Sequence, residues 1–98
     1  LEHCVYNRLH IIIGLSKDKD IQGVLQLLPL YATYYFTQAQ IPRALPANEL
    51  AAIASELKLA GKYFADVNKA LDEALLHAHK EDMILICGSV FLAGEVKI

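Results

Sequence analysis

The stretch Arg8–Pro29, RLHIIIGLSKDKDIQGVLQLLP, decides the fold that the sequence predicts. Its first part, Arg8–Gly14, is short, rich in isoleucine and ends at a glycine, which is typical of a buried parallel strand. After it, apolar residues recur at the spacing of one helix face, at Ile21, Val24, Leu25 and Leu28. We expect Ser16 or Asp18 to cap this helix and Pro29 to end it. A strand followed by such a helix indicates a crossover unit of a parallel sheet.

The same alternation continues along the chain. Further strands are expected at Ala32–Ala39, Lys62–Asp66 and Met83–Cys87. A loop and a long helix separate the first two of these strands. This helix has Pro46 in its first turn and Gly61 at its end.

Two more helices complete the predicted pattern. Asp66 is expected to cap a helix that begins at Val67, and a last helix is expected to begin after Gly88 and Ser89. The alternating order predicts an α/β protein, a three-layer, Rossmann-like domain with a mostly parallel sheet and helices on both faces. The 98 residues suffice for one small domain. Because the chain opens with leucine, we interpret residues 1–98 as a single domain cut from a longer protein.

Composition argues against several classes of protein. Hydrophobic residues make up 55% of the chain, charged residues make up 20%, and the net charge is −2 with scattered Lys and Arg. Nucleic-acid binding needs clustered basic groups, so we expect no nucleic-acid partner. No apolar stretch reaches the roughly 18 residues of a membrane span, so we expect no membrane association. Cys4 and Cys87 lie far apart, which favours a reduced, cytoplasmic protein over a disulfide scaffold.

Three loops follow strands and would meet at the edge where open parallel sheets bind their ligands. They read GLSKDKD, TQAQIPRA and CGS. In the last loop, Gly88 allows a sharp turn, and Ser89 would stand at a helix N-terminus whose free N–H groups attract an anion. The plainer alternative is a turn and a helix cap alone. A helix N-terminus contributes at most about 2 kcal/mol, whereas millimolar binding needs about 4 kcal/mol, so this loop needs further binding groups.

Arg43 is the candidate cation of the middle loop. Two prolines stiffen that loop, and a guanidinium can hold a carboxylate or phosphate through two hydrogen bonds. An arginine that is merely exposed, or one that braces the loop, is an equally good interpretation. The Lys17–Asp20 run is more typical of a helix start than of a ligand site.

The sequence lacks residues for self-sufficient catalysis. His77 and His79 are two apart on a helix and point to different sides, so they cannot chelate one metal ion. His10 lies within a strand, where we expect a structural role. The chain has no Ser-His-Asp set, no Cys-x-x-Cys pair and no phosphate loop of the Gly-x-x-x-x-Gly-Lys type. We therefore expect neither a catalytic residue nor a metal ligand.

Three stretches together resemble a known family. RLHIIIGLSKDKDI, YYFTQAQIPRALPANELA and ILICGSVFLAGEV are similar, in this order, to the C-terminal domain of folylpolyglutamate synthases, within the Mur ligase superfamily. These enzymes include the bifunctional dihydrofolate synthases. The more specific motifs are T-x-A-x-x-P-R-A at Thr37–Ala44 and G-S-x-F-x-x-G-E-V at Gly88–Val96. The resemblance runs from Arg8 to Val96, and the helices in the middle are generic.

The resemblance implies an ATP-dependent ligase. Such enzymes use ATP and Mg²⁺ to phosphorylate a folate carboxylate, and the amine of L-glutamate attacks the acyl phosphate to form an amide. The phosphate loop and the metal ligands belong to an N-terminal ATPase domain, over which the C-terminal domain closes. The 98 residues alone would then hold no cofactor tightly and would be inactive. Whether dihydropteroate is also a substrate stays open, because folate is held mainly by the other domain.

The resemblance also implies a site at the carboxyl ends of the strands. Its glutamate-binding residues would be Gly88 and Ser89. Further residues near the cleft would be Arg43, Thr37, Lys17 and Asp18. The family's Asp-x-x-His-Asn nucleotide motif is absent from the sequence. We expect that the chain begins just after this motif, and that the first strand of the family's six-stranded sheet would be missing with it.

A rival interpretation is a stand-alone flavodoxin-like or response-regulator-like module that binds a partner or a small anion without catalysis. A response regulator needs an acidic pair at the end of its first strand, and HIIIGLS has none. A truncated scaffold without activity of its own is a further alternative, which is compatible with the ligase interpretation.

Overall fold

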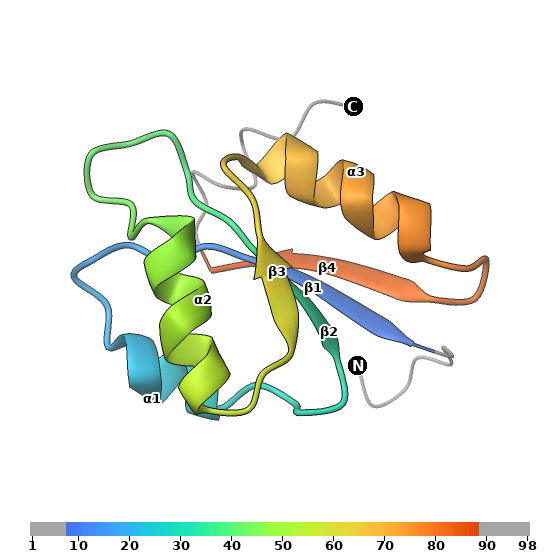
Figure 1. Ribbon diagram of the computed structural model, residues 1–98, viewed down its shortest axis with the longest axis horizontal. Coiled ribbons are helices and arrows are strands. Elements are labelled where there is room, and N and C mark those ends of the chain that lie inside the picture. Colours follow the sequence, from blue (N-terminus) through green and yellow to red (C-terminus); the bar gives the residue numbers. More distant parts are fainter. Residues whose placement is uncertain (1–7, 89–98) are drawn as a thin grey trace.

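The computed structural model describes residues 8–88, in which strands and helices alternate as the sequence predicts (Figure 1). The strands are β1 (Leu9–Ile13), β2 (Thr33–Phe36), β3 (Gly61–Tyr63) and β4 (Met83–Cys87). The helices are α1 (Ile21–Gln26), α2 (Ala47–Glu56) and α3 (Val67–His77). The helix expected after Ser89 lies outside the described residues.

The described strands form one parallel sheet in the order β3-β2-β1-β4, which confirms the predicted parallel architecture. Ile13 at the end of β1 aligns with Phe36 on β2 and with Cys87 on β4, so these three strands end side by side. The chain moves from β1 outward to β2 and β3, and then crosses to the other side of β1 to form β4. The gap between the ends of β1 and β4 is therefore a topological switch point, where open α/β sheets bind ligands.

Helices cover both faces of the sheet, which confirms the three-layer α/β fold (Figure 1). On one face, α1 and α2 pack against the odd-numbered residues of β1, and the buried cluster includes Leu25, Leu50, Ile11, Ile13 and Phe36. On the other face, α3 packs through small residues, and the buried cluster includes Val67, Ala70, Ala74, Ile12 and Tyr35. Successive side chains of a strand point to opposite faces, so β1 is apolar nearly throughout because both faces are covered.

The start of α1 differs from the expectation. Asp20, not Ser16 or Asp18, is the N-cap, and its carboxylate accepts a hydrogen bond of 3.2 Å from the backbone N–H of Gly23. Ser16 is used elsewhere, because it forms a β-bridge with Ala44 and its hydroxyl donates to Asp18. The helix therefore starts late and has only six residues.

The end of α2 also differs, because the expected helix end at Gly61 is wrong. The helix ends at Glu56, and Lys58 adopts the left-handed conformation, with a φ of 68°. Gly61 instead opens β3, where a Cβ would lie 2.1 Å from the carbonyl oxygen of Tyr34. β3 thus begins one residue earlier than expected and ends at Tyr63.

At the N-terminus of α3 the structure confirms the predicted cap, whereas at the N-terminus of α2 the predicted position of Pro46 differs. Asp66 caps α3 as predicted, and its carboxylate accepts hydrogen bonds of 2.8 and 3.0 Å from two backbone N–H groups of the first turn. Pro46 precedes α2 instead of standing in its first turn. Because proline has no capping side chain, the side-chain oxygen of Gln38 accepts a 2.8 Å hydrogen bond from the N–H of Ala47 in its place.

Candidate functional site

Gly88 and Gly14 meet at the switch point of the sheet. Gly88 has a φ of +106°, and a Cβ there would lie 2.1 Å from the carbonyl oxygen of Gly14. The N–H of Gly14 donates to the carbonyl oxygen of Cys87 at 3.4 Å, which carries the β1–β4 pairing to the ends of both strands. A side chain at Gly88 would both strain the backbone and collide, so glycine is required. The left-handed backbone at Gly88 agrees with the sharp turn predicted there, and Gly88 lies against Gly14, where the loop after β1 begins.

The loop after β1 also pairs with the loop after β2. Ser16 and Ala44 form an antiparallel bridge, flanked by backbone hydrogen bonds of 2.9 and 2.7 Å. In the shorter of these, the N–H of Lys17 donates to the carbonyl oxygen of Arg43. Two candidate segments that are far apart in the sequence are therefore joined through their backbones.

The loop after β2 is tied to its neighbours on other sides as well. The N–H of Thr37 donates to the carbonyl oxygen of Ile13 at 2.8 Å, and its hydroxyl donates to the carbonyl oxygen of Phe64 at 3.1 Å. The side-chain amide of Gln40 donates to the carbonyl oxygen of Ala65 at 3.0 Å. The backbone that carries Arg43 is therefore held in place before any ligand arrives, which lowers the entropic cost of binding.

Charged side chains line the exposed surface of the paired loops. Lys17, Asp18 and Arg43 are all exposed. The Ser16 hydroxyl donates a 2.6 Å hydrogen bond to Asp18, and this bond is the main cause that lowers the pKa of the carboxyl group. The positive charges of Arg43 and Lys19 make smaller contributions in the same direction. Asp18 is thus ionised at neutral pH, and it lies within electrostatic range of Arg43.

The structure places some, but not all, of the expected site residues in loops at one edge of the sheet. Four of them lie in loops at the carboxyl edge of the sheet: Gly88, Arg43, Lys17 and Asp18. Thr37 lies at the same edge, but it is buried and its hydroxyl is engaged by Phe64, so it holds the loop. Ser89 lies outside the described residues.

Sequence reasoning missed two residues of this edge. Gly14 directly follows a predicted strand at the carboxyl edge of the sheet, where ligands bind. This position could have indicated that Gly14 lies close to Gly88. Gln38 carries no local signal for its role as the cap of α2. The cavity between the two paired loops holds no more than a water molecule, so the described loops do not by themselves enclose an amino acid.

Some further features of residues 8–88 bear on function. No group of three or more His, Cys, Asp or Glu side chains in this range is arranged to hold a metal ion, and no helix there is long and apolar enough to cross a membrane. Cys87 is a free thiol, and burial raises its pKa, which lowers its reactivity. Cys4 lies outside the described residues.

A three-layer α/β domain with fixed loops at the switch point of a parallel sheet belongs to the broad class of Rossmann-like ligand-binding and catalytic domains. Within that class, the chain belongs to the family described as "Mur ligase, glutamate ligase domain", whose sequence model matches residues 1–90. This result confirms the family resemblance. It also favours the ligase interpretation over the flavodoxin-like alternative.

Relatives and solved structures agree with this assignment. The chain is 33% identical over 90 residues to the dihydrofolate synthase/folylpolyglutamate synthase of Escherichia coli (strain K12), a match that covers 91% of this chain and 20% of the relative. The structure of E. coli FolC in complex with DHPP and ADP aligns with a TM-score of 0.81 and 32% identity, over 95% of this chain and 22% of that one.

A second solved structure adds other ligands. A bifunctional folylpolyglutamate synthase/dihydrofolate synthase with Mn, AMPPNP and L-glutamate bound aligns with a TM-score of 0.76 and 28% identity, over 87% of this chain and 20% of that one. The chain thus spans about a fifth of the length of these relatives.

Proposed function

We propose that the chain is the C-terminal domain of an ATP-dependent ligase that adds L-glutamate to folates, and that its carboxyl-edge loops help to bind the glutamate. In this reaction, ATP phosphorylates a folate carboxylate to give an acyl phosphate and ADP. The glutamate amine then attacks the acyl carbon, phosphate leaves, and an amide bond forms. The names of the relatives and the bound L-glutamate of one structural neighbour support this reaction.

The observation that carries the proposal is the convergence of the family motifs at one edge of the sheet. Gly88 lies against Gly14, and the Lys17 N–H is bonded to the Arg43 carbonyl, so parts of all three motif stretches lie together. The exposed guanidinium of Arg43 can hold a glutamate carboxylate, and N–H groups that follow Gly88 can add further hydrogen bonds. These groups together supply the additional binding energy that a helix N-terminus alone lacks.

A second domain would complete the site. The described loops enclose only a water-sized cavity, and residues 8–88 provide no set of metal ligands. ATP and Mg²⁺ would therefore be held mainly by an N-terminal ATPase domain, over which this domain closes. Closure would exclude water from the acyl phosphate, which hydrolysis would otherwise destroy. The role left to this chain is to position the amine donor.

The test is an assay of product formation. A protein that joins this chain to its N-terminal ATPase domain is incubated with a monoglutamyl folate, ATP, Mg²⁺ and L-glutamate, and the folate is analysed by mass spectrometry. We expect a product that is heavier by one glutamyl residue, formed only when ATP is present. The 98-residue chain alone should give none. Absence of the product with the joined protein, or turnover by the chain alone, would overturn the proposal.

A further inference from the structure

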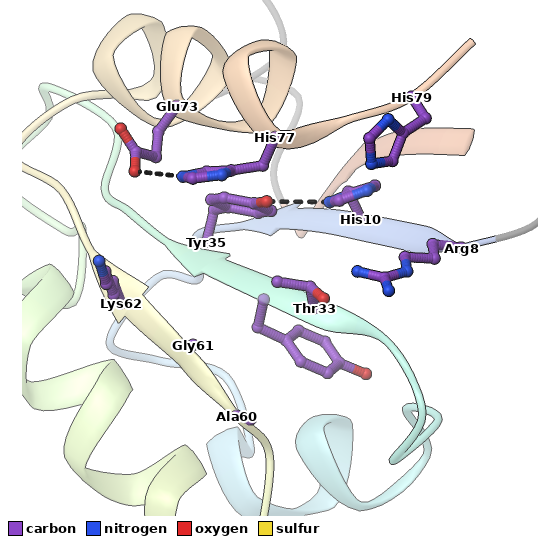
Figure 2. A pocket seen from close by; sticks show the side chains of 11 residues that line it. Arg8, His10, Thr33, Tyr35, Ala60, Gly61, Lys62, Glu73, His77 and His79 are labelled. Atoms are coloured by element: carbon purple, nitrogen blue, oxygen red, sulfur yellow. Dashed lines mark hydrogen bonds and ion pairs between the residues drawn. The ribbon is translucent and has the colours of Figure 1, made fainter. Parts of the chain in front are cut away.

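A second pocket lies at the opposite, amino-terminal edge of the sheet, below the last turns of α3 (Figure 2). Its volume is about 580 Å³, which falls within the range of small-molecule sites. The polar side chains that line it include Arg8, Thr33, Lys62, Glu73, His77 and His79. None of these residues belongs to the carboxyl-edge loops, so the pocket is separate from the candidate glutamate site.

The pocket exists because α3 covers only part of its face of the sheet. The helix packs on Ile12 and Tyr35 through its small residues. Arg8 and His10 precede Ile12 at even positions, so they share its face, and Thr33 shares the face of Tyr35. This uncovered end of the face is polar, while the covered end is apolar.

The unpaired charged side chains at this pocket are cations. Within residues 8–88, neither Arg8 nor Lys62 makes a side-chain hydrogen bond or an ion pair, and both are exposed. The one carboxylate that lines the pocket, that of Glu73, is engaged by the ring Nε2 of His77 at 2.8 Å. A ligand that enters would therefore meet unpaired cations and an already paired acid.

The floor of the pocket is held by a buried hydrogen-bonded chain. The Tyr35 hydroxyl and Nδ1 of His10 share a hydrogen bond of 2.9 Å. Nε2 of His10 donates to the carboxylate of Asp82 at 3.0 Å. The Asp82 side chain is fully buried behind His10 and also accepts from the N–H of His79 at 2.9 Å. These hydrogen bonds fix the side chains at the floor of the pocket and keep the Asp82 carboxylate away from the pocket surface.

The two free cations stand at opposite ends of the pocket. Lys62 aligns with Tyr35, and Tyr35 with Ile12, so Arg8 lies two strands across and four residues along from Lys62. From the strand spacing and rise, their Cα atoms are about 16 Å apart. Figure 2 shows the Arg8 guanidinium directed inward toward Thr33, with Tyr35 and Thr33 between the two cations. Both side chains are long, so they can close on the two ends of one elongated ligand.

We propose that this pocket binds a small organic or inorganic anion with at least two acidic groups, carboxylates or phosphates, held between Arg8 and Lys62. Arg8 would hold one acidic group through its planar fork of N–H donors, and Lys62 would pair with the other. The Thr33 hydroxyl would add a hydrogen bond between them. A ligand with a single acidic group would engage only one cation and bind much more weakly.

The test is isothermal titration calorimetry of the full chain with citrate, with pyrophosphate and with acetate. We expect saturable one-to-one binding of citrate, pyrophosphate or both, and none of acetate at the same concentration. Binding of citrate alone identifies carboxylates as the ligand class, and binding of pyrophosphate alone identifies phosphates. Arg8→Gln and Lys62→Gln should each weaken the binding by about tenfold or more, while Arg8→Lys should retain part of it.

Two matched variants complete the design. Lys58→Gln removes an exposed lysine that follows α2 and does not line the pocket, and Lys69→Gln removes an exposed lysine from the first turn of α3. Both should bind the anions like the unaltered protein. Circular dichroism confirms that every variant is folded. The proposal is overturned if neither citrate nor pyrophosphate gives saturable binding, or if Arg8→Gln and Lys62→Gln bind as tightly as the two matched variants.

Discussion

Gly88 has no room for a Cβ, because such an atom would lie 2.1 Å from the carbonyl oxygen of Gly14. The turns that leave β4 and β1 are thus in backbone contact at the switch point. We predict that Gly88→Ala lowers the free energy of unfolding by at least about 2 kcal/mol, from left-handed backbone strain and from the collision. Chemical denaturation measures this loss. Ser55→Ala, on the exposed face of α2, should change stability by less than about 0.5 kcal/mol. Equal stability of the two variants would contradict the backbone contact.

The stability of the protein should fall in alkali because of Tyr34. This buried residue donates a hydrogen bond to the carbonyl oxygen of Pro29, and burial is the main cause that raises its pKa to about 12. Between pH 10 and about 12 the folded state keeps the phenol proton that the unfolded state loses, so stability falls as the pH rises through this range.

Tyr34→Phe separates this effect from other alkaline titrations. The variant should be less stable by about 1 kcal/mol at pH 7, where it lacks the hydrogen bond. Its stability should fall less steeply than that of the unaltered protein above pH 10. Urea denaturation at a series of pH values measures both quantities, and parallel pH curves for the two proteins would contradict the assigned role of Tyr34.

We predict that Asp82 stabilises the folded protein at neutral pH and that this contribution is lost in acid. The hydrogen bond from the His79 N–H, followed by that from His10, lowers the pKa of Asp82 below its ordinary value of 3.8. Its contribution is therefore present above pH 3.8 and is lost as the pH falls through the lowered folded pKa. Asp82→Asn should lower the Tm by several degrees at pH 7 and by progressively less below pH 4. Asp72→Asn, at an exposed position of α3, should show neither effect. A Tm difference independent of pH would rule out this linkage.

Gln38 should stabilise α2 from outside the helix. Its side-chain oxygen accepts the hydrogen bond from the Ala47 N–H that Pro46 cannot cap. Gln38→Ala should cost about 1 kcal/mol of stability, the usual effect of losing an N-cap. Gln22→Ala, on the exposed side of α1, is the matched control. A loss no larger than that of the control, measured by urea denaturation, would show that the cap is dispensable.

Local sequence patterns predicted the strands and the fold class because they report burial directly. The apolar runs that became β1 and β4 are covered by helices or paired with neighbours, and Asp66 caps its own helix. The cap of α1 was missed although a local signal was present, because Asp20 stands directly before Ile21, the first apolar residue of the helix face. The bridge between Ser16 and Ala44 depends on a distant segment, and it keeps Ser16 out of the helix start.

The carboxyl-edge loops and the pocket between Arg8 and Lys62 differ in how far the sequence alone predicted them. The carboxyl-edge loops follow strands, so a general rule placed their residues together before the structure did. Arg8 and Lys62 come from strands whose pairing register sets their positions, and neither lies in a recognisable motif. The hydrogen-bonded chain through Asp82, His10 and Tyr35 likewise depends on tertiary contacts. Only the structural role expected for His10 was readable from its place inside a strand.

The most direct test of the central claim is the steady-state kinetics of L-glutamate in the protein that joins this chain to its ATPase domain. We predict that Arg43→Gln and Ser89→Ala each raise the KM for L-glutamate by about tenfold or more, with the KM for ATP nearly unchanged. Lys69→Gln should alter neither value. Unchanged glutamate kinetics in both Arg43→Gln and Ser89→Ala would contradict the claim that these loops hold the amine donor.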